Sequence, residues 1–106
     1  MAFCSVGYAL EVLSGKWKIK TIYAISLAGT IRFNELQRSL PGISNIMLSK
    51  TLKELEDSGV IKRFQYNEVP PRVEYTLSEV GKGIIPVFDK LGEWGNTLHE
   101  ELSNSQ

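Results

Sequence analysis

Apolar residues recur along this chain of 106 residues at two different spacings. Over residues 5–58 and again over 79–102 they return every three or four positions, which is typical of helices with one buried face. Over residues 72–77 apolar and polar side chains alternate, as in a strand. The pattern predicts a single domain over residues 1–106, mainly α-helical with a small β-hairpin, of the α+β class.

Glycine, proline and serine residues divide the helical regions into segments. Gly15, Gly29 and Gly59 are each placed to end a helix, because glycine adopts the left-handed conformation of a helix C-terminus at little cost. The Pro41-Gly42 pair ends another helix, and Ser44 can cap the next one. These breaks predict helices at about residues 5–14, 16–28, 34–40, 45–58 and 79–102, and a short strand at about 30–33.

Two short helices around a tight turn, followed by a hairpin, are the geometry of a winged helix-turn-helix. This fold places one helix in the major groove of DNA and a β-ribbon, the wing, beside it. We expect the helix-turn-helix at about residues 34–58 and the wing at about residues 60–77. The terminal helices, at about 5–14 and 79–102, lie outside this DNA-reading unit.

The helix at 45–58 is the one that we expect to enter the groove. Leu48, Leu52 and Leu55 follow the spacing of an inward stripe, so the opposite face is exposed. Donors and acceptors near a helix N-terminus can read base edges, and an outward isoleucine can contact a thymine methyl group. The predicted DNA contacts here are Asn45, Ile46, Ser49, Lys50 and Lys53. A solvated helix face without a partner is the alternative interpretation.

The tip of the predicted wing is stiff and is followed by a cation. Pro70-Pro71 has no backbone N–H to donate, so residues 67–71 stay outside the strand pairing. Arg72 follows directly and can contact a phosphate or the minor groove. The alternative is an ion pair between Arg72 and Glu68 or Glu74 on the ribbon. We favour the DNA contact, because exposed ion pairs contribute little stability.

The helix at 79–102 carries more apolar surface than so small a domain can cover. Ser78 can cap it, and Pro86 is expected to kink it near its first turns. The dimerisation residues that we expect on its apolar stripe are Ile84, Phe88, Leu91, Trp94 and Leu98. The stripe predicts a two-fold homodimer through this helix, with help from the helix at 5–14. A helix folded back on its own domain is the alternative.

The charge distribution favours a nucleic-acid partner, although the formal net charge is zero. Residues 16–72 hold ten basic and five acidic residues, a net charge of +5. Residues 73–106 hold two basic and six acidic residues, a net charge of −4. A basic centre beside an acidic tail suits a protein that presents one face to phosphate. Solvated helix faces would explain the same counts.

Composition indicates a cytoplasmic protein that is not an enzyme. A single cysteine cannot form an intrachain disulfide, and we expect neither a signal peptide nor the roughly 20-residue apolar run of a membrane span. His99, the only histidine, has no second histidine or cysteine at ligand spacing, so no metal or other cofactor is expected. Phosphate-loop, nucleophile-elbow and paired-carboxylate motifs are lacking as well.

Motifs spread over most of the chain match those of one known family. They are Gly15-Lys16-Trp17, Arg32-Phe33-Asn34-Glu35-Leu36, Leu40-Pro41-Gly42-Ile43-Ser44, Met47-Leu48, Leu52-Lys53-Glu54-Leu55-Glu56 and Val69-Pro70-Pro71-Arg72-Val73-Glu74-Tyr75-Thr76-Leu77, with Gly81 and Trp94 behind them. From Cys4 to about Gly95 the chain resembles the HxlR-type winged helix-turn-helix transcriptional regulators. The resemblance implies a homodimer on a palindromic operator, a wing contact by Arg72 and dimerisation through the terminal helices. It also implies that the helix holding Ser44 to Glu56 lies in the major groove, which adds Ser44 to the predicted DNA contacts.

Two positions depart from the pattern of the family. Ile46 and Thr51 stand where relatives often carry basic residues. Because each neutralised phosphate releases counterions, losing those charges lowers DNA affinity and flattens its salt dependence. We expect weaker binding, or a different operator, than the resemblance alone implies.

Cys4 matches a single cysteine that several such relatives use to sense oxidants or electrophiles. With Ser5 as the helix cap, the Cys4 thiol would lie at a helix N-terminus, where the dipole favours the thiolate. An incidental thiol without a sensing role is the alternative. Redox sensing through Cys4 is therefore a hypothesis.

The sequence as a whole predicts a sequence-specific regulator that binds double-stranded DNA as a homodimer. We favour a repressor over an activator, because blocking polymerase demands only occupancy. The alternative is a winged-helix module for protein–protein contact without DNA binding, which the neutral net charge and the apolar stripe leave open.

Overall fold

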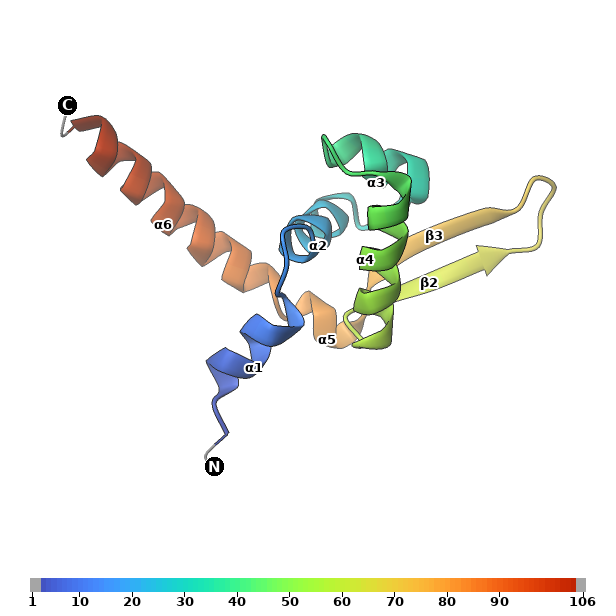
Figure 1. Ribbon diagram of the computed structural model, residues 1–106, viewed down its shortest axis with the longest axis horizontal. Helices are drawn as coiled ribbons and strands as arrows, with labels where there is room; N and C mark the ends of the chain where they lie inside the picture. Colours follow the sequence, from blue (N-terminus) through green and yellow to red (C-terminus); the bar gives the residue numbers. More distant parts are fainter. Residues whose placement is uncertain (1–2, 105–106) are drawn as a thin grey trace.

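The computed structural model describes residues 3–104 and has the predicted fold, mainly helical with a small antiparallel sheet (Figure 1). Its elements are α1 (Ser5–Val12), α2 (Lys18–Ala28), β1 (Thr30–Arg32), α3 (Phe33–Ser39), α4 (Asn45–Asp57), β2 (Ile61–Tyr66), β3 (Arg72–Leu77), α5 (Glu79–Lys82) and α6 (Ile85–Asn104). The helix-turn-helix comprises α3 and α4, and β2 and β3 form the wing. Within residues 3–104, no helix has the length and apolar content to cross a membrane.

Helices α2, α3 and α4 pack beside a three-stranded sheet around one hydrophobic core. The strand order is β1-β3-β2 with both pairings antiparallel, so Tyr75 of β3 lies opposite Ile31 on one side and Arg63 on the other. The buried apolar residues are Ile22, Ile25, Ile31, Leu36, Leu40, Ile43, Leu48, Leu52, Leu55, Ile61, Tyr75 and Leu77. We call residues 17–77, which supply all of these side chains, the body.

Glycines with positive φ end α2 and α4, as the sequence predicts. Gly29 follows α2 with a φ of +80°, and Gly59 follows α4 with a φ of +82°. After α4, the Gly59 N–H bonds to the Glu56 carbonyl and the Val60 N–H bonds to the Leu55 carbonyl, both at 3.0 Å. These are the two hydrogen bonds of a Schellman motif, which satisfies the last carbonyls of the helix and turns the chain toward the wing.

The helix predicted over residues 79–102 is interrupted in the structure. α5 ends at Lys82, and α6 begins at Ile85 after a turn that changes the direction of the chain (Figure 1). In a continuous helix, the ring of Pro86 would clash with the carbonyl of Lys82 and offer it no N–H. Proline is tolerated in a first helical turn, so α6 starts just before it. The prediction of one kinked helix is therefore wrong, because the helix is interrupted by a turn at residues 83–84.

A close approach of backbones holds α5 against the body. Ser78 caps α5: its Oγ accepts a hydrogen bond from the Gly81 N–H at 2.9 Å and lies 2.6 Å from the Gly59 carbonyl oxygen. A Cβ at Gly81 would overlap the carbonyl oxygen of Val60, so only glycine fits there without displacement. These contacts fix α5 on the segment that leads into the wing.

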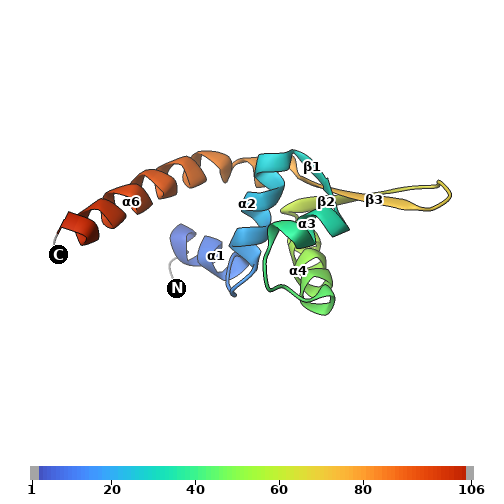
Figure 2. The ribbon, with the colours of Figure 1, turned by 90° about the horizontal axis from the view of Figure 1, so that it is seen from above.

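The terminal helices α1 and α6 project from the body on the side away from the wing, as Figures 1 and 2 both show. Neither helix contains a buried residue. Their exposed large apolar side chains include Val6, Tyr8, Leu10, Ile85, Val87, Leu91, Trp94 and Leu98. Ile84, in the turn before α6, and Phe88 instead pack against the core, with the Phe88 and Tyr23 rings 5.0 Å apart. Ile84 and Phe88 are thus partly covered by their own chain, whereas Leu91, Trp94 and Leu98 remain exposed. A role of all five residues in dimerisation stays a prediction.

Candidate nucleic-acid interface

The first two turns of α4 present polar side chains and one isoleucine to solvent. Leu48, Leu52 and Leu55 are buried, as their spacing predicts. The predicted DNA contacts on α4, all of them exposed, are Asn45, Ile46, Ser49, Lys50 and Lys53. Ile46 is 83% exposed, although it is a large apolar residue. Amide, hydroxyl and ammonium groups around an exposed methyl-bearing side chain suit base edges, which offer donors, acceptors and thymine methyl groups side by side.

Ser44 and Thr51 have structural roles in α4. The Ser44 Oγ accepts a hydrogen bond from the Met47 N–H at 3.0 Å, so Ser44 is the predicted N-cap. Thr51 is only 3% exposed and lies on the core side of the helix. Thr51 itself therefore packs into the fold, although it also borders the groove that Lys16 and Lys50 line. The expectation that a longer basic residue at this position would contact phosphate stays a prediction.

Acidic side chains mark the C-terminal half of α4. Lys53 Nζ lies 3.1 Å from Asp57 Oδ1, and this hydrogen bond, together with the charge of Asp57, raises the pKa of Lys53 above its ordinary value. Glu54 Oε2 lies 3.1 Å from the ammonium of Lys18, which ties α4 to the start of α2. Because carboxylates repel phosphate, the N-terminal half of α4 is the part suited to close contact with DNA.

The guanidinium of Arg72 lies on the surface of the wing among acidic and aromatic neighbours. Its Nη2 is 3.3 Å from Glu68 Oε1, and its Nε is 3.8 Å from Glu74 Oε2. It also lies 4.2 Å from the centre of the Tyr66 ring. This is the ion-paired arrangement that the sequence left as the alternative. A DNA contact by Arg72 stays a prediction, and it requires the guanidinium to leave both carboxylates.

Two cations without a predicted role lie on opposite flanks of α4. Arg63 of β2 lines a groove of about 250 Å³ together with Ser49 and Lys53, between α4 and the wing. Lys16, just before α2, lines a groove of about 380 Å³ together with Lys50 on the other flank. In the sequence both cations appear only as part of the basic centre, because their approach to α4 depends on tertiary packing. Cations therefore border the exposed face of α4 on both sides, and each groove also has a carboxylate toward the C-terminal half of α4, Glu56 near Arg63 and Glu54 near Lys16.

Comparison with known proteins places this arrangement in a family, since residues 12–103 match the model of the HxlR-like helix-turn-helix. The chain belongs to the HxlR-like helix-turn-helix family. A relative from Methanothermobacter thermautotrophicus, named an HTH-type transcriptional regulator, is 47% identical over 102 residues, which are 96% of this chain and 77% of the relative. The family predicted from the sequence motifs is confirmed.

Solved structures of similar proteins share the fold of this HxlR-like regulator. The structure of the HTH-type transcriptional regulator ytcD matches with a TM-score of 0.85 and a sequence identity of 42%. The match covers 92% of this chain and 99% of the ytcD chain. The structure of the redox regulator HypR in its reduced form matches with a TM-score of 0.86 and a sequence identity of 39%. The match covers 95% of this chain and 99% of the HypR chain. HxlR-like proteins are winged-helix, DNA-binding transcriptional regulators, a class distinct from enzymes.

The cysteine of this HxlR-like regulator lies at the start of α1. Cys4 is exposed and is itself the N-cap, with its Sγ accepting a hydrogen bond from the Gly7 N–H at 3.3 Å. The prediction of Ser5 as the cap is wrong by one residue, because Cys4 has the extended backbone of a cap and Ser5 is already helical. Within residues 3–104, no cluster of histidine, cysteine or acidic residues is arranged to hold a metal ion.

Proposed function

We propose that this HxlR-like regulator acts in the cytoplasm as a homodimer that binds a palindromic operator in double-stranded DNA and represses transcription. The observation that carries the proposal is the exposed N-terminal half of α4, bordered by Lys16 on one flank and Arg63 on the other. Phosphates run along both edges of the major groove, whereas base edges lie between them. Groups that read bases, with cations on either side, match that layout.

Each exposed side chain of α4 has a distinct role in this proposal. Asn45 offers an amide that can bond to adenine at two atoms, and Lys50 offers an ammonium for guanine. Ser49 adds a hydroxyl that can donate or accept, and Ile46 packs against a thymine methyl group. Lys53 gives up its ion pair with Asp57 and contacts a phosphate instead. Sequence is thus read by the first two turns, and the later residues position the helix.

The wing adds backbone contacts beside α4. Arg63 lines the groove next to α4, and no carboxylate of the described residues holds it in an ion pair, so it is free to contact a phosphate. Arg72 must first leave Glu68 and Glu74, and its side chain is only partly exposed, so this exchange has a cost that the counterions released on phosphate binding must offset. We therefore assign Arg63 the larger share of the affinity that the wing supplies, and Arg72 the smaller.

Dimerisation through α1 and α6 follows from their exposed apolar faces. Leu91, Trp94 and Leu98 recur at helical spacing on α6, and Val6 and Leu10 do so on α1. Apolar surface of this extent is typical of an association site, and a two-fold axis buries the same patch on both subunits. The two recognition helices should then lie about 34–36 Å apart, or a multiple of that, as successive half-sites require.

Gel shifts with fragments selected from a randomised DNA pool, run over a series of salt concentrations, test the proposal. Lys53→Ala should weaken binding to all sequences and reduce the salt slope by about 1. Asn45→Ala should relax specificity at one base position at a cost of about 1–3 kcal/mol. Lys90→Ala, on α6 and paired with Glu93, is the control that should change neither.

The same experiment decides between a DNA reader and a protein–protein module. A module should show no salt-dependent shift, and the Asn45 and Lys53 variants should match the parent. That result would contradict the proposed function.

We further propose that Cys4 makes operator binding sensitive to oxidants. Supporting this, the thiol is exposed at the start of α1, beside a proposed dimer surface, and the similar protein HypR, named a redox regulator, has been solved in reduced and oxidised forms. With one cysteine per chain, a disulfide must join Cys4 of two copies or Cys4 and a small thiol. Two thiols then lose two protons and two electrons to the oxidant, for example diamide, which becomes a hydrazine.

The Cys4→Ser protein tests this sensitivity in the same gel shift. Diamide should change operator affinity in the parent and leave the variant unaffected. An equal response of both proteins would rule out sensing through Cys4.

A further inference from the structure

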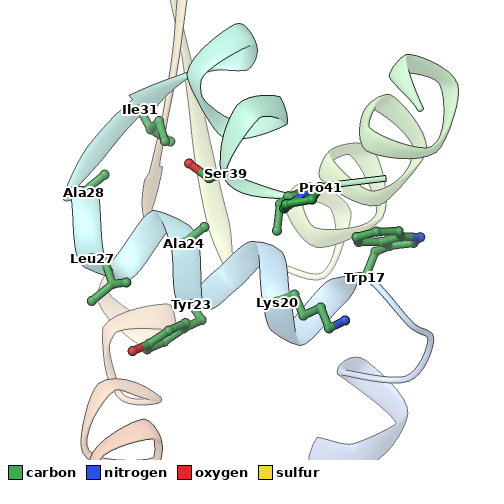
Figure 3. A pocket seen from close by; sticks show the side chains of 10 residues that line it. Trp17, Lys20, Tyr23, Ala24, Leu27, Ala28, Ile31, Ser39 and Pro41 are labelled. Carbon is green, nitrogen blue, oxygen red and sulfur yellow. The ribbon is translucent and has the colours of Figure 1, made fainter. Parts of the chain in front are cut away.

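A groove of about 490 Å³ lies between α2 and the turn of the helix-turn-helix, away from the proposed DNA-reading face of α4 (Figure 3). Figure 3 shows Trp17 beside Pro41 at one end, and Leu27 and Ala28 toward the other. Most of the lining side chains are apolar. The volume falls within the roughly 300–1,000 Å³ typical of sites for small molecules.

Lys20 supplies a positive charge to this groove. Lys20 is exposed, and its ammonium lies 5.5 Å from the centre of the Trp17 ring. Among residues 3–104, no carboxylate lies within ion-pair distance of this ammonium. Two hydroxyl-bearing residues also line the groove: the Ser39 hydroxyl donates to the Glu35 carbonyl at 3.0 Å, and Tyr23 adds a phenol. Lys16 lies just beyond the groove, with its ammonium 5.0 Å from the centre of the Trp17 ring, so this end of the groove is positively charged. Apolar walls with positive charge at one end favour a ligand that carries an anionic group on an apolar body.

The groove borders the segment that positions α4. Pro41 lines it directly, and the next residue, Gly42, has a φ of +91° and faces the Trp17 ring, which lies 3.9 Å from where a Cβ would stand. Ser44, the N-cap of α4, follows two residues later. A ligand wedged between Trp17 and Pro41 therefore presses on the turn that sets where the N-terminal end of α4 lies.

We propose that this groove binds a compact apolar molecule carrying one carboxylate or sulfonate, and that the bound ligand weakens operator binding by displacing the turn. The second half rests on the proposed function. Trp17 and Pro41 contact the apolar body, and Lys20 pairs with the anion. Linkage then requires the ligand and the operator to weaken each other by the same factor.

Calorimetry with 2-naphthoate and its neutral counterpart 2-naphthamide tests the site directly. The acid should bind the intact dimer about threefold to fivefold more tightly than the amide, because only the acid pairs with the exposed Lys20 ammonium. Lys20→Met should remove that preference while the amide binds as before, and Lys90→Met should keep it. Ala28→Phe, which fills one end of the groove at an exposed position, should weaken both ligands. Absence of binding, or equal affinity for acid and amide in the parent, would overturn the proposal.

Fluorescence anisotropy with a labelled operator tests the coupling. Saturating 2-naphthoate should lower operator affinity of the parent about fivefold or more, within the usual range of coupling factors, and leave Lys20→Met much less affected. Unchanged operator affinity with ligand bound would refute the coupling. If the ligand-free protein fails to bind DNA, the proposed function has failed instead, and the calorimetry still decides whether the site exists.

A second copy of the chain is the competing occupant of the groove. If a partner chain covered it, 2-naphthoate would bind more weakly at higher protein concentration and would shift the sedimenting mass toward the monomer. We expect the mass of the dimer to stay the same on adding ligand, and a shift to monomer would count against the ligand site.

Discussion

The body and the terminal helices carry the same amphipathic pattern but use it differently. In the body, the apolar faces of α2 and α4 meet each other and the sheet, so that Ile22 and Leu48 are fully buried. In α1 and α6 the apolar faces meet solvent, and Trp94 is 63% exposed. Helical periodicity therefore predicts that one face of a helix is buried, but it does not predict what buries that face. For α4 the chain's own core does so, and for α6 we propose that a second copy does.

Truncating a buried leucine should break the body first. Leu48 is fully buried in α4, so Leu48→Ala removes packing and leaves a cavity that costs about 2–5 kcal/mol of the free energy of unfolding. Urea titration followed by circular dichroism measures the loss. Ile46→Ala, on the exposed face of the same helix, should change stability by less than about 0.5 kcal/mol. Equal effects at both positions would contradict the assignment of the two faces.

Charging the stripe of α6 should separate the subunits and spare the body. Leu91→Asp combined with Leu98→Asp places two carboxylates on the proposed dimer surface, where they cannot be desolvated. We expect monomers in sedimentation equilibrium, a nearly unchanged circular dichroism spectrum, and operator affinity about 100-fold lower, because two linked half-site contacts become one. A persistent dimer would refute the assignment of α6.

A methyl group at Gly81 should strain the joint between the two regions. Gly81→Ala forces the backbone of α5 and Val60 apart, at a cost of about 1–3 kcal/mol that thermal unfolding can measure. Gly92→Ala is the matched control, since a Cβ there meets open space in α6 and should stabilise the helix by about 0.5–1 kcal/mol. If both substitutions stabilise, the close approach at Gly81 is not tight.

Removing the cap of α4 should have a smaller effect. Ser44→Ala leaves the Met47 N–H without its side-chain acceptor, so we expect a loss of about 1 kcal/mol in thermal unfolding. Ser49→Ala, an exposed serine inside the same helix, should cost little. Matching losses would show that the cap contributes nothing specific.

The smallest effect should come from the exposed pair at the end of α4. Asp57 raises the pKa of Lys53 above 10.5, so the pair stabilises the fold below that pH and the contribution disappears as pH rises through the pKa of the folded state. Asp57→Asn should return the pKa toward 10.5, as side-chain NMR titration would show. Glu56→Gln should move it less. A larger shift from Glu56→Gln would contradict this order.

Local signals made much of the body readable from the sequence. Gly29, Gly59 and Ser44 act within one turn of backbone, so the ends of α2 and α4 follow from residue type alone. The stripe of Leu48, Leu52 and Leu55 likewise fixed the outward face of α4. The sequence predicted a kink at Pro86 where the structure has a break between α5 and α6. The apolar spacing continues across residues 83–84, so the pattern alone does not show that the helix is interrupted there.

Tertiary contacts could not be read in the same way. Thr51 lies beside the leucine stripe on the wheel, and only packing shows that the core includes it. Arg72 has two possible sets of partners, and its choice of Glu68 and Glu74 depends on how the wing twists. The groove at Lys20 joins α2 to the turn after α3, so it exists only once the helices have packed.

The contact between Gly81 and Val60 has a consequence for operator evolution. α5 is only four residues long, yet it sets the angle at which the 20-residue α6 departs. In a two-fold pair, a small rotation at this joint is doubled and carried along the full arm, so it alters how far apart the half-sites can be. If the protein pairs through α6 as we propose, operators with a longer or shorter spacer should therefore select substitutions around position 81 before any change in the residues proposed to read bases.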